Sequence, residues 1–341
     1  MAATPQDSSN SQHGEPNALL SRFIAVKLLN QDQSGHRIIL LGTIDGNPSL
    51  LAIERAAFPS DEAAAFAIPQ QLVEVKNLGA NDVYHWFMAR SASDATNIQT
   101  TALAGPDLKL NLITPCTSKH IKKYSPQKIR MVTETPGVYH QHVRPYILAQ
   151  KEAGRMDWVY NILEGRKEQE DIIYRETRSG EYELGHDPEG FLLLPDMNWD
   201  RKTVASLRIL GLVERRDLLS LRDLRKKDIS WLKAMMNRML DAVERTYGNQ
   251  GVERDCLKVY MHYQPTYYHF HLHILSTSVE PNATQAMGKA FSLPNLISQL
   301  ETMQGGPEAG MHDVELTYSI GEESDLWNVV FCPLKEGKTM P

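Results

Sequence analysis

The segment from Tyr267 to Leu275, Tyr-Tyr-His-Phe-His-Leu-His-Ile-Leu, constrains the fold of this chain more than any other feature. Successive side chains of a β-strand point to opposite faces, so the three histidines share one face, while Phe270, Leu272 and Ile274 share the other. The apolar face predicts burial in a core, and the imidazole face predicts a cleft. His262 lies on the preceding predicted strand, and a short hairpin would bring it alongside the row.

The second half of the chain alternates between strand-like and helix-like patterns. An antiparallel sheet with helices on one face, an α+β domain, is the economical arrangement for such a pattern. The predicted helices are Asp157–Glu164, about Thr203–Glu214, about Lys227–Tyr247 and about Pro294–Met303. The predicted strands are Asp171–Glu176, Gly190–Leu194, Leu257–His262 and Tyr267–Ser276.

The first half has a different character. Residues 1–18 are rich in Ser, Gln, Asn and Pro, which predicts a disordered tail. Residues 19–116 contain six short strand-like runs separated by turn residues, which predicts a β-rich N-terminal domain. Residues 117–150 become helical in pattern and predict a connector, leaving residues 151–341 as the C-terminal domain.

Composition narrows the function classes. The chain has 341 residues and a formal net charge of -6, which disfavours a protein that wraps a long nucleic acid. Three scattered cysteines suggest neither a disulfide framework nor a Cys-rich zinc site. The sequence shows no run long enough for a signal peptide or a membrane span. We expect a cytoplasmic protein with no membrane partner, and the nucleus stays open as a second compartment.

The histidine row admits three interpretations. In the first, the three histidines are structural. Burial of three imidazoles at every second position would cost free energy, which makes this interpretation unfavourable unless the histidines have a function. A zinc site is the sharper rival, but the row contains no Asp, Glu or Cys. The third interpretation is an imidazole nucleophile, His271, that attacks phosphorus and forms a covalent nucleotidyl-histidine intermediate. One of its ring nitrogens must then be unprotonated while the other donates to a backbone carbonyl. His269 and His273 would donate to phosphate oxygens or orient the strand.

The pattern His-φ-His-φ-His-φ-φ, where φ is apolar, is matched in full by His269 to Leu275 and resembles the signature of the histidine triad superfamily of nucleotide hydrolases and transferases. Four more segments, in matching order, resemble the scavenger mRNA decapping branch of that superfamily. They are Asn81–Tyr84, Lys119–Tyr124, Trp158–Leu163 and Pro195–Trp199.

This resemblance implies hydrolysis of 7-methylguanosine cap dinucleotides, or of very short capped oligonucleotides left by 3′ to 5′ mRNA decay. The implied products are 7-methylguanosine monophosphate and a nucleoside diphosphate. It also implies a homodimer whose N-terminal domains are swapped and close over two active sites. No metal or other cofactor is implied.

The resemblance also implies a cap-binding pocket. Trp158 would stack on the cationic methylated ring, with Met197 on its other side. Glu168 would accept from the guanine edge, and Pro195 and Asp196 would contact base and ribose.

The remaining implied contacts are to the phosphates and from the N-terminal domain. Lys123 would bind phosphate, His262 would lie near the phosphates, and Thr266 and Tyr267 would supply a pair of hydroxyls. Asn81 and Tyr84 would reach the ligand when the domain closes.

Two positions depart from the family pattern. Asn198 stands where the family usually has a lysine, and Lys289 is the nearest substitute for an arginine that follows the triad. The stretch Thr177–Glu189 is longer than the family needs. Two alternatives therefore stay open: a general dinucleoside polyphosphate hydrolase of the same superfamily, and a cap-binding regulator with little turnover.

Overall fold

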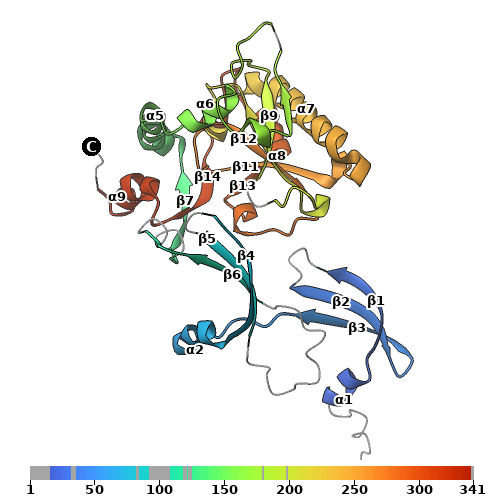
Figure 1. Ribbon diagram of the computed structural model, residues 1–341. Coiled ribbons are helices and arrows are strands. Elements are labelled where there is room, and N and C mark those ends of the chain that lie inside the picture. The colour runs from blue at the N-terminus through green and yellow to red at the C-terminus, as the bar shows by residue number, and fades with distance from the viewer. Residues whose placement is uncertain are drawn as a thin grey trace, which may run out of the picture. The chain divides into compact units, whose positions relative to one another are not determined.

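The computed structural model describes residues 16–31, 36–81, 84–91, 108–117, 121, 125–178, 180–196 and 199–338, without the side chains of residues 16–18, 80, 81 and 84. The chain divides into two compact units, Met1–Pro126 and Gln127–Pro341 (Figure 1). Most of the predicted tail lies outside the described residues, and its end forms the short helix α1 (Pro16–Ser21). No described helix is both long and apolar enough to cross a membrane.

The first unit is β-rich, as predicted. It holds two antiparallel sheets of three strands each, with order β1-β2-β3 and β4-β5-β6. Asp45 and Gly46 both have positive φ and form the two-residue turn between β2 and β3, a geometry that suits a tight hairpin. The elements are β1 (Ile24–Gln31), β2 (Arg37–Ile44), β3 (Asn47–Glu54), α2 (Glu62–Ala67), β4 (Leu72–Asn81), β5 (Tyr84–Ser91) and β6 (Leu108–Ile113).

The second unit is built on a six-stranded antiparallel sheet with order β13-β11-β12-β10-β9-β8. Strand β12 lies between β11 and β10, which places the histidine row near the centre of the sheet. The strands are β8 (Tyr174–Glu176), β9 (Phe191–Pro195), β10 (Arg208–Val213), β11 (Leu257–His262), β12 (His271–Ser276) and β13 (Ala290–Ser292).

Helices cover both faces of this sheet, and the prediction of helices on one face is wrong. Helices α7 (Ile229–Tyr247) and α8 (Leu293–Thr302) share the main core with Leu272 and Ile274. Helix α6 (Asp157–Leu163) packs instead against Leu192, Leu194 and Leu212 on the histidine face (Figure 1). Because β9 is apolar on both faces, both must be covered.

The segment predicted as a helix at about Thr203–Glu214 forms strand β10. Its sequence Arg-Ile-Leu-Gly-Leu-Val is apolar on both faces, and it pairs with β9 on one side and β12 on the other. Gly211 lets α7 approach closely, since a Cβ there would lie 2.8 Å from Sδ of Met239. Tertiary pairing therefore decides the conformation of this segment.

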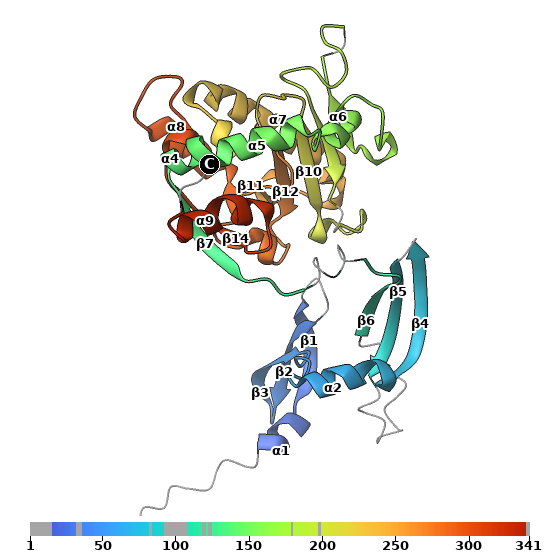
Figure 2. The same ribbon diagram turned by 90° about the vertical axis from the view of Figure 1, so that its left-hand side faces the viewer.

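The predicted connector at 117–150 does not form one helical unit. Strand β7 (Ile129–Glu134) occupies part of it and pairs with β14 (Leu316–Gly321), as Figure 2 shows. Helical structure follows in α4 (Pro136–Val138), the turn Tyr139–Val143 and α5 (Arg144–Glu152). The unit boundary lies at Pro126 because β7 belongs to the second unit, which ends with the helical segments Trp327–Phe331 and α9 (Cys332–Lys335).

Candidate active site

The histidine row lies partly on β12 and partly before it. The strand begins at His271, not at Tyr267 as predicted, so that His269 belongs to the preceding loop. His271 pairs with Leu212 of β10, and His273 lies between Leu210 of β10 and Tyr260 of β11. All three histidines are buried. Pairing with β10 holds the His271 backbone in register, and pairing on both sides holds that of His273.

The His271 imidazole has a defined tautomer. Its Nδ1 lies 2.7 Å from the carbonyl oxygen of His269. A carbonyl oxygen only accepts, so Nδ1 carries the proton and donates, which leaves a lone pair on Nε2. The prediction that one ring nitrogen of His271 donates to a backbone carbonyl is confirmed.

Burial keeps the His271 ring uncharged. Desolvation is the main cause that lowers the pKa of His271 to about 3, and the neighbouring His269, His262 and Lys289 lower it further. The hydrogen bond to the His269 carbonyl acts in the opposite direction and is outweighed. At neutral pH the Nε2 lone pair is therefore available.

His269 orients its neighbours through two bonds. Its own Nε2–H donates to the carbonyl oxygen of Val213 at 2.7 Å, and its carbonyl holds His271. The side chain is 1% exposed, and desolvation lowers its pKa to about 4. Of the two roles predicted for His269, this geometry supports orientation of the strand, because Nε2 is already engaged.

His262 comes alongside the row as predicted. Its ring centroid lies 4.2 Å from that of His273, and its Nε2–H donates to the carbonyl oxygen of Thr284 at 2.8 Å. Desolvation, followed by the charge of Lys289, lowers the pKa of His262 to about 4. His262 is thus a neutral donor already committed to the backbone.

His273 has a free polar atom on the same face. Tyr260 stacks on its ring at 5.2 Å, and its Nδ1 lies 3.9 Å from a carboxylate oxygen of Asp196. Its Nε2 is buried and has no hydrogen-bond partner among the described residues. A ligand atom at Nε2 would remove the energetic cost of that unpaired group.

Two aromatic rings link the row to a pocket. Tyr267 stacks on His271 with ring centroids 4.3 Å apart, and the Trp158 indole meets Tyr267 edge to face at 4.8 Å. Trp158 is 43% exposed although it lies on a helix that packs on the sheet. The Tyr267 hydroxyl is buried and lacks a partner among the described residues.

The pocket has a volume of about 420 Å³ and brings together Trp158, Thr266, Tyr267 and Lys289. The Lys289 ammonium donates to the carbonyl oxygen of Gln264 at 2.5 Å, and burial lowers its pKa. Gln264, Pro265 and Tyr268, with residues from the segments 146–156 and 319–326, complete the lining. No motif pointed to these segments, because only the tertiary fold brings them to the site.

The other predicted site residues fall into three groups. Pro195 ends β9, and Asp196 follows it directly. Glu168 is exposed, has φ of 54° and precedes the short helical turn Gln169–Asp171. Asn81 and Tyr84 end β4 and begin β5 in the first unit, and their side chains are not described. Lys123, Met197 and Asn198 lie outside the described residues.

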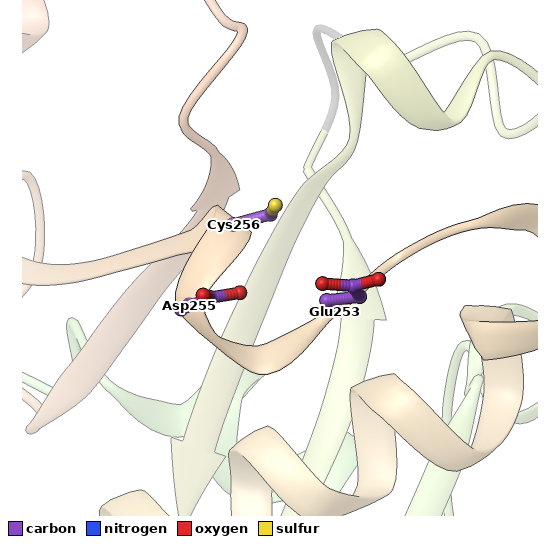
Figure 3. Close-up of side chains that lie close together, drawn as sticks. All are labelled: Glu253, Asp255 and Cys256. Carbon is purple, nitrogen blue, oxygen red and sulfur yellow. The ribbon is translucent and has the colours of Figure 1, made fainter.

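A separate group of potential metal ligands lies away from the row. Glu253, Asp255 and Cys256 offer ligand atoms within 4.8 Å of one another (Figure 3). They directly precede β11, whose first residue, Leu257, pairs with Ser276 at the opposite end of β12 from His271. Among the residues that the structure describes, the histidine row itself is not part of a metal-ligand group.

The stretch Thr177–Glu189, described except for Ser179, is held by two buried carboxylates. Asp187 accepts from the guanidinium and the backbone N–H of Arg178, and Glu214 accepts from Thr177 at 2.6 Å and from the Asp187 N–H at 2.9 Å. These bonds order the stretch and link it to the end of β10.

Comparison with known proteins gives a consistent result across the chain. Residues 18–127 match the scavenger mRNA decapping enzyme (DcpS) N-terminal family, and residues 157–288 match the scavenger mRNA decapping enzyme C-term binding family. These segments fall within the two units seen in the structure, apart from Gln127.

Curated relatives agree with the family matches. An m7GpppX diphosphatase of Schizosaccharomyces pombe is 34% identical over 310 residues, covering 91% of this chain and 94% of that protein. The m7GpppX diphosphatase of Ascaris suum is 33% identical, covering 77% of this chain and 79% of its own. The human protein of that name is 27% identical, covering 82% and 78% respectively. The chain therefore belongs to the scavenger mRNA decapping enzyme family of hydrolases.

Proposed function

We propose that this protein hydrolyses 7-methylguanosine cap dinucleotides and short capped oligonucleotides, with His271 as nucleophile. The products are 7-methylguanosine monophosphate and a nucleoside diphosphate, or an RNA shortened to its 5′-diphosphate. The observation that supports this proposal best is the His271 tautomer, which leaves a neutral lone pair on Nε2. Tyr267, whose ring stacks on that imidazole, lines the pocket. The names of the relatives supply the substrate class.

The reaction has two displacements. In the first, Nε2 of His271 forms a bond to the phosphorus attached to 7-methylguanosine, and the bond from that phosphorus to the bridging oxygen breaks with its electron pair. The nucleoside diphosphate leaves with that oxygen. In the second, water attacks the same phosphorus, the N–P bond breaks, and Nε2 recovers its lone pair while the water proton passes to solvent.

Groups around His271 supply charge and donors for the phosphate oxygens. Lys289 is half-buried at the pocket, and a cation there offsets the negative charge of the phosphate chain. The Tyr267 hydroxyl and Nε2 of His273 are both buried without a partner among the described residues, so each can engage a phosphate oxygen. Lys123 and Asn198 complete the phosphate contacts in this proposal.

Recognition of the methylated base falls to Trp158 and the residues around it. An exposed indole is the surface that a cationic ring needs, and Trp158 keeps its indole accessible beside Tyr267. Met197 would cover the other face of the base, Glu168 would accept from its edge, and Pro195 and Asp196 would contact base and ribose.

We also propose that the protein is a homodimer with swapped N-terminal domains. The first unit exposes an unusual amount of apolar surface: every residue of β1 is exposed, with Ile24 at 67% and Val26 at 68%, as is Leu50 of β3 at 67%. Such a surface is typical of an interface. Closure of that domain, with Asn81 and Tyr84, would admit short capped fragments and reject long RNA.

Light scattering coupled to size exclusion tests the dimer. The parent protein should have twice the mass of one chain. The double variant Ile24→Glu/Val26→Glu should have a lower measured mass, because the charges disrupt the interface. A parent protein with the mass of one chain would contradict the dimer but would not affect the proposal that His271 is the nucleophile.

The function is tested by incubating the purified protein with methylated and unmethylated cap dinucleotides and separating the products. We expect preferential cleavage of the methylated substrate to 7-methylguanosine monophosphate, and no cleavage by His271→Asn. Equal cleavage of both substrates would instead indicate a general dinucleoside polyphosphate hydrolase. Tight binding without turnover would indicate a cap-binding regulator.

A further inference from the structure

A buried carboxylate lies behind the candidate active site. Glu134, the last residue of β7, is fully buried and forms an ion pair with the equally buried Arg222, with Nε and Oε1 2.7 Å apart. The hydroxyls of Tyr263 and Tyr318 donate to the two carboxylate oxygens at 2.7 and 2.6 Å. The Gln264 amide donates to Oε2 at 3.3 Å.

The guanidinium has its other partners in the backbone. Arg222 donates through Nη1 to the carbonyl oxygens of Met311 and Val314, both at 2.6 Å, and through Nη2 to the carbonyl oxygen of Glu134 at 2.9 Å. A buried ion pair gains little stability over apolar packing, but a fully bonded one permits a single arrangement of its partners. Four separate parts of the chain therefore meet at Glu134 in one geometry.

One of these parts leads directly into the active site. Tyr263 and Gln264 begin the loop that carries Thr266 and Tyr267, and Tyr268 closes it by donating to the Gln264 side chain at 3.2 Å. The loop passes from β11 into β12, so any shift of it changes what lies beside the histidine row.

The loop controls two groups next to the nucleophile. Its Gln264 carbonyl oxygen accepts from the Lys289 ammonium, and its Tyr267 ring stacks on the His271 imidazole. We infer that Glu134, acting through Tyr263 and Gln264, is a positioning residue that sets the Lys289 ammonium and the Tyr267 ring relative to His271. This inference rests on the proposed function. Glu134 and Tyr318 both lie outside the two segments that match the family.

The experiment removes single hydroxyls from the cluster and retains the rings. Tyr263→Phe and Tyr318→Phe each delete one donor to Glu134, and each ring keeps its edge-to-face contact with the other at 4.8 Å. We expect kcat for the methylated dinucleotide to fall by about tenfold or more, with a smaller change in KM, because displaced groups near the reacting phosphorus act mainly on the chemical step. Glu134→Gln should have a larger effect, although it leaves Arg222 without its counter-charge and endangers folding.

Tyr139→Phe is the matched control. Tyr139 is also buried and lies under the Arg222 guanidinium, but its hydroxyl accepts from Arg144 at 3.3 Å and does not bond the loop. The Tyr139→Phe protein should keep the parental kcat. The ¹⁵N resonances of the His271 ring should move in the Tyr263 and Tyr318 variants and stay unchanged in Tyr139→Phe.

The outcomes separate this inference from the proposed function. Folded Tyr263→Phe and Tyr318→Phe proteins with parental kcat and parental His271 resonances would overturn the positioning role. An equal loss of kcat in Tyr139→Phe would also overturn it, because the effect would then be one of general packing. A parent protein that does not cleave the dinucleotide would refute the proposed function, and the His271 resonances would still decide whether Glu134 positions the loop.

Discussion

The Nδ1–H of His271 donates to the carbonyl oxygen of His269 across 2.7 Å, two residues earlier in the chain. This bond fixes the rotation of the ring and assigns the lone pair to Nε2. Strand pairing with Leu212 fixes the backbone beneath it. Together they give a nucleophile that needs no base to remove a proton, since burial already keeps the ring neutral.

The pH dependence of turnover should reflect this burial. An ordinary histidine nucleophile would lose activity as the pH falls through about 6.5, where its ring gains a proton. With the pKa of His271 lowered to about 3 and those of His262 and His269 to about 4, kcat should stay level between pH 7 and pH 5. A fall in kcat centred near pH 6.5, in protein shown to be folded by circular dichroism, would contradict this account.

The free energy of unfolding, unlike kcat, should fall as the pH is lowered from 7 to 5. Each buried histidine has a lower pKa in the folded chain than in the unfolded chain, so below about pH 6.5 only the unfolded chain binds the proton. The free energy of unfolding should be highest above pH 6.5. It should fall by roughly 1.4 kcal/mol per pH unit for each such histidine between pH 6.5 and about 4.

Urea unfolding at pH 7 and pH 5 measures this effect. His262→Gln removes one of the titrating rings and should make the pH dependence shallower. The same urea midpoint at both pH values would show that the histidines are not buried as described.

Replacement of Trp158 should alter selectivity more than stability. Because the indole is 43% exposed, we expect Trp158→Ala to change the free energy of unfolding by about 1 kcal/mol or less. Its loss removes the face that attracts the methylated ring, so the ratio of kcat/KM for methylated over unmethylated dinucleotide should fall at least about tenfold. Trp231→Ala is the control, since that indole donates to the Pro188 carbonyl and packs under Arg215. A parental ratio in Trp158→Ala would exclude Trp158 from base recognition.

The Tyr267 hydroxyl offers a second selective test. It is buried without a partner among the described residues, so Tyr267→Phe should change stability by no more than about 0.5 kcal/mol. If the hydroxyl donates to a phosphate oxygen, kcat should fall by about tenfold or more. Tyr160→Phe is the matched control, because that hydroxyl is equally buried and unpartnered among the described residues. Equal kcat values for both variants and the parent would remove Tyr267 from the reaction.

Local patterns in the sequence predicted the parts of the site that lie on single elements. Alternation around His271 predicted the strand from His271 onward, although His269 lies in the loop before it, and the hairpin expected between the two strands predicted the approach of His262. The long apolar stripe at Lys227–Tyr247 predicted α7, which the structure confirms over Ile229–Tyr247.

Features made by distant pairing could not be predicted in this way. The run that forms β10 is apolar enough for a helix or a strand, and only its two neighbours decide between them. Strand β7 gains its partner from β14, and pairs such as Glu134 with Leu316 join residues that lie far apart in the chain. Glu134 is a charged residue and gives no local signal of burial, which follows instead from Arg222 and the tyrosines that surround it.

The stereochemical course at phosphorus tests the covalent role of His271 most directly. The substrate is a cap dinucleotide with a phosphorothioate of known configuration at the phosphate attached to 7-methylguanosine, hydrolysed in ¹⁸O-labelled water. Two in-line displacements, first by His271 and then by water, predict net retention of configuration in the 7-methylguanosine product. Net inversion would mean that water attacks directly, and it would contradict His271 as the nucleophile.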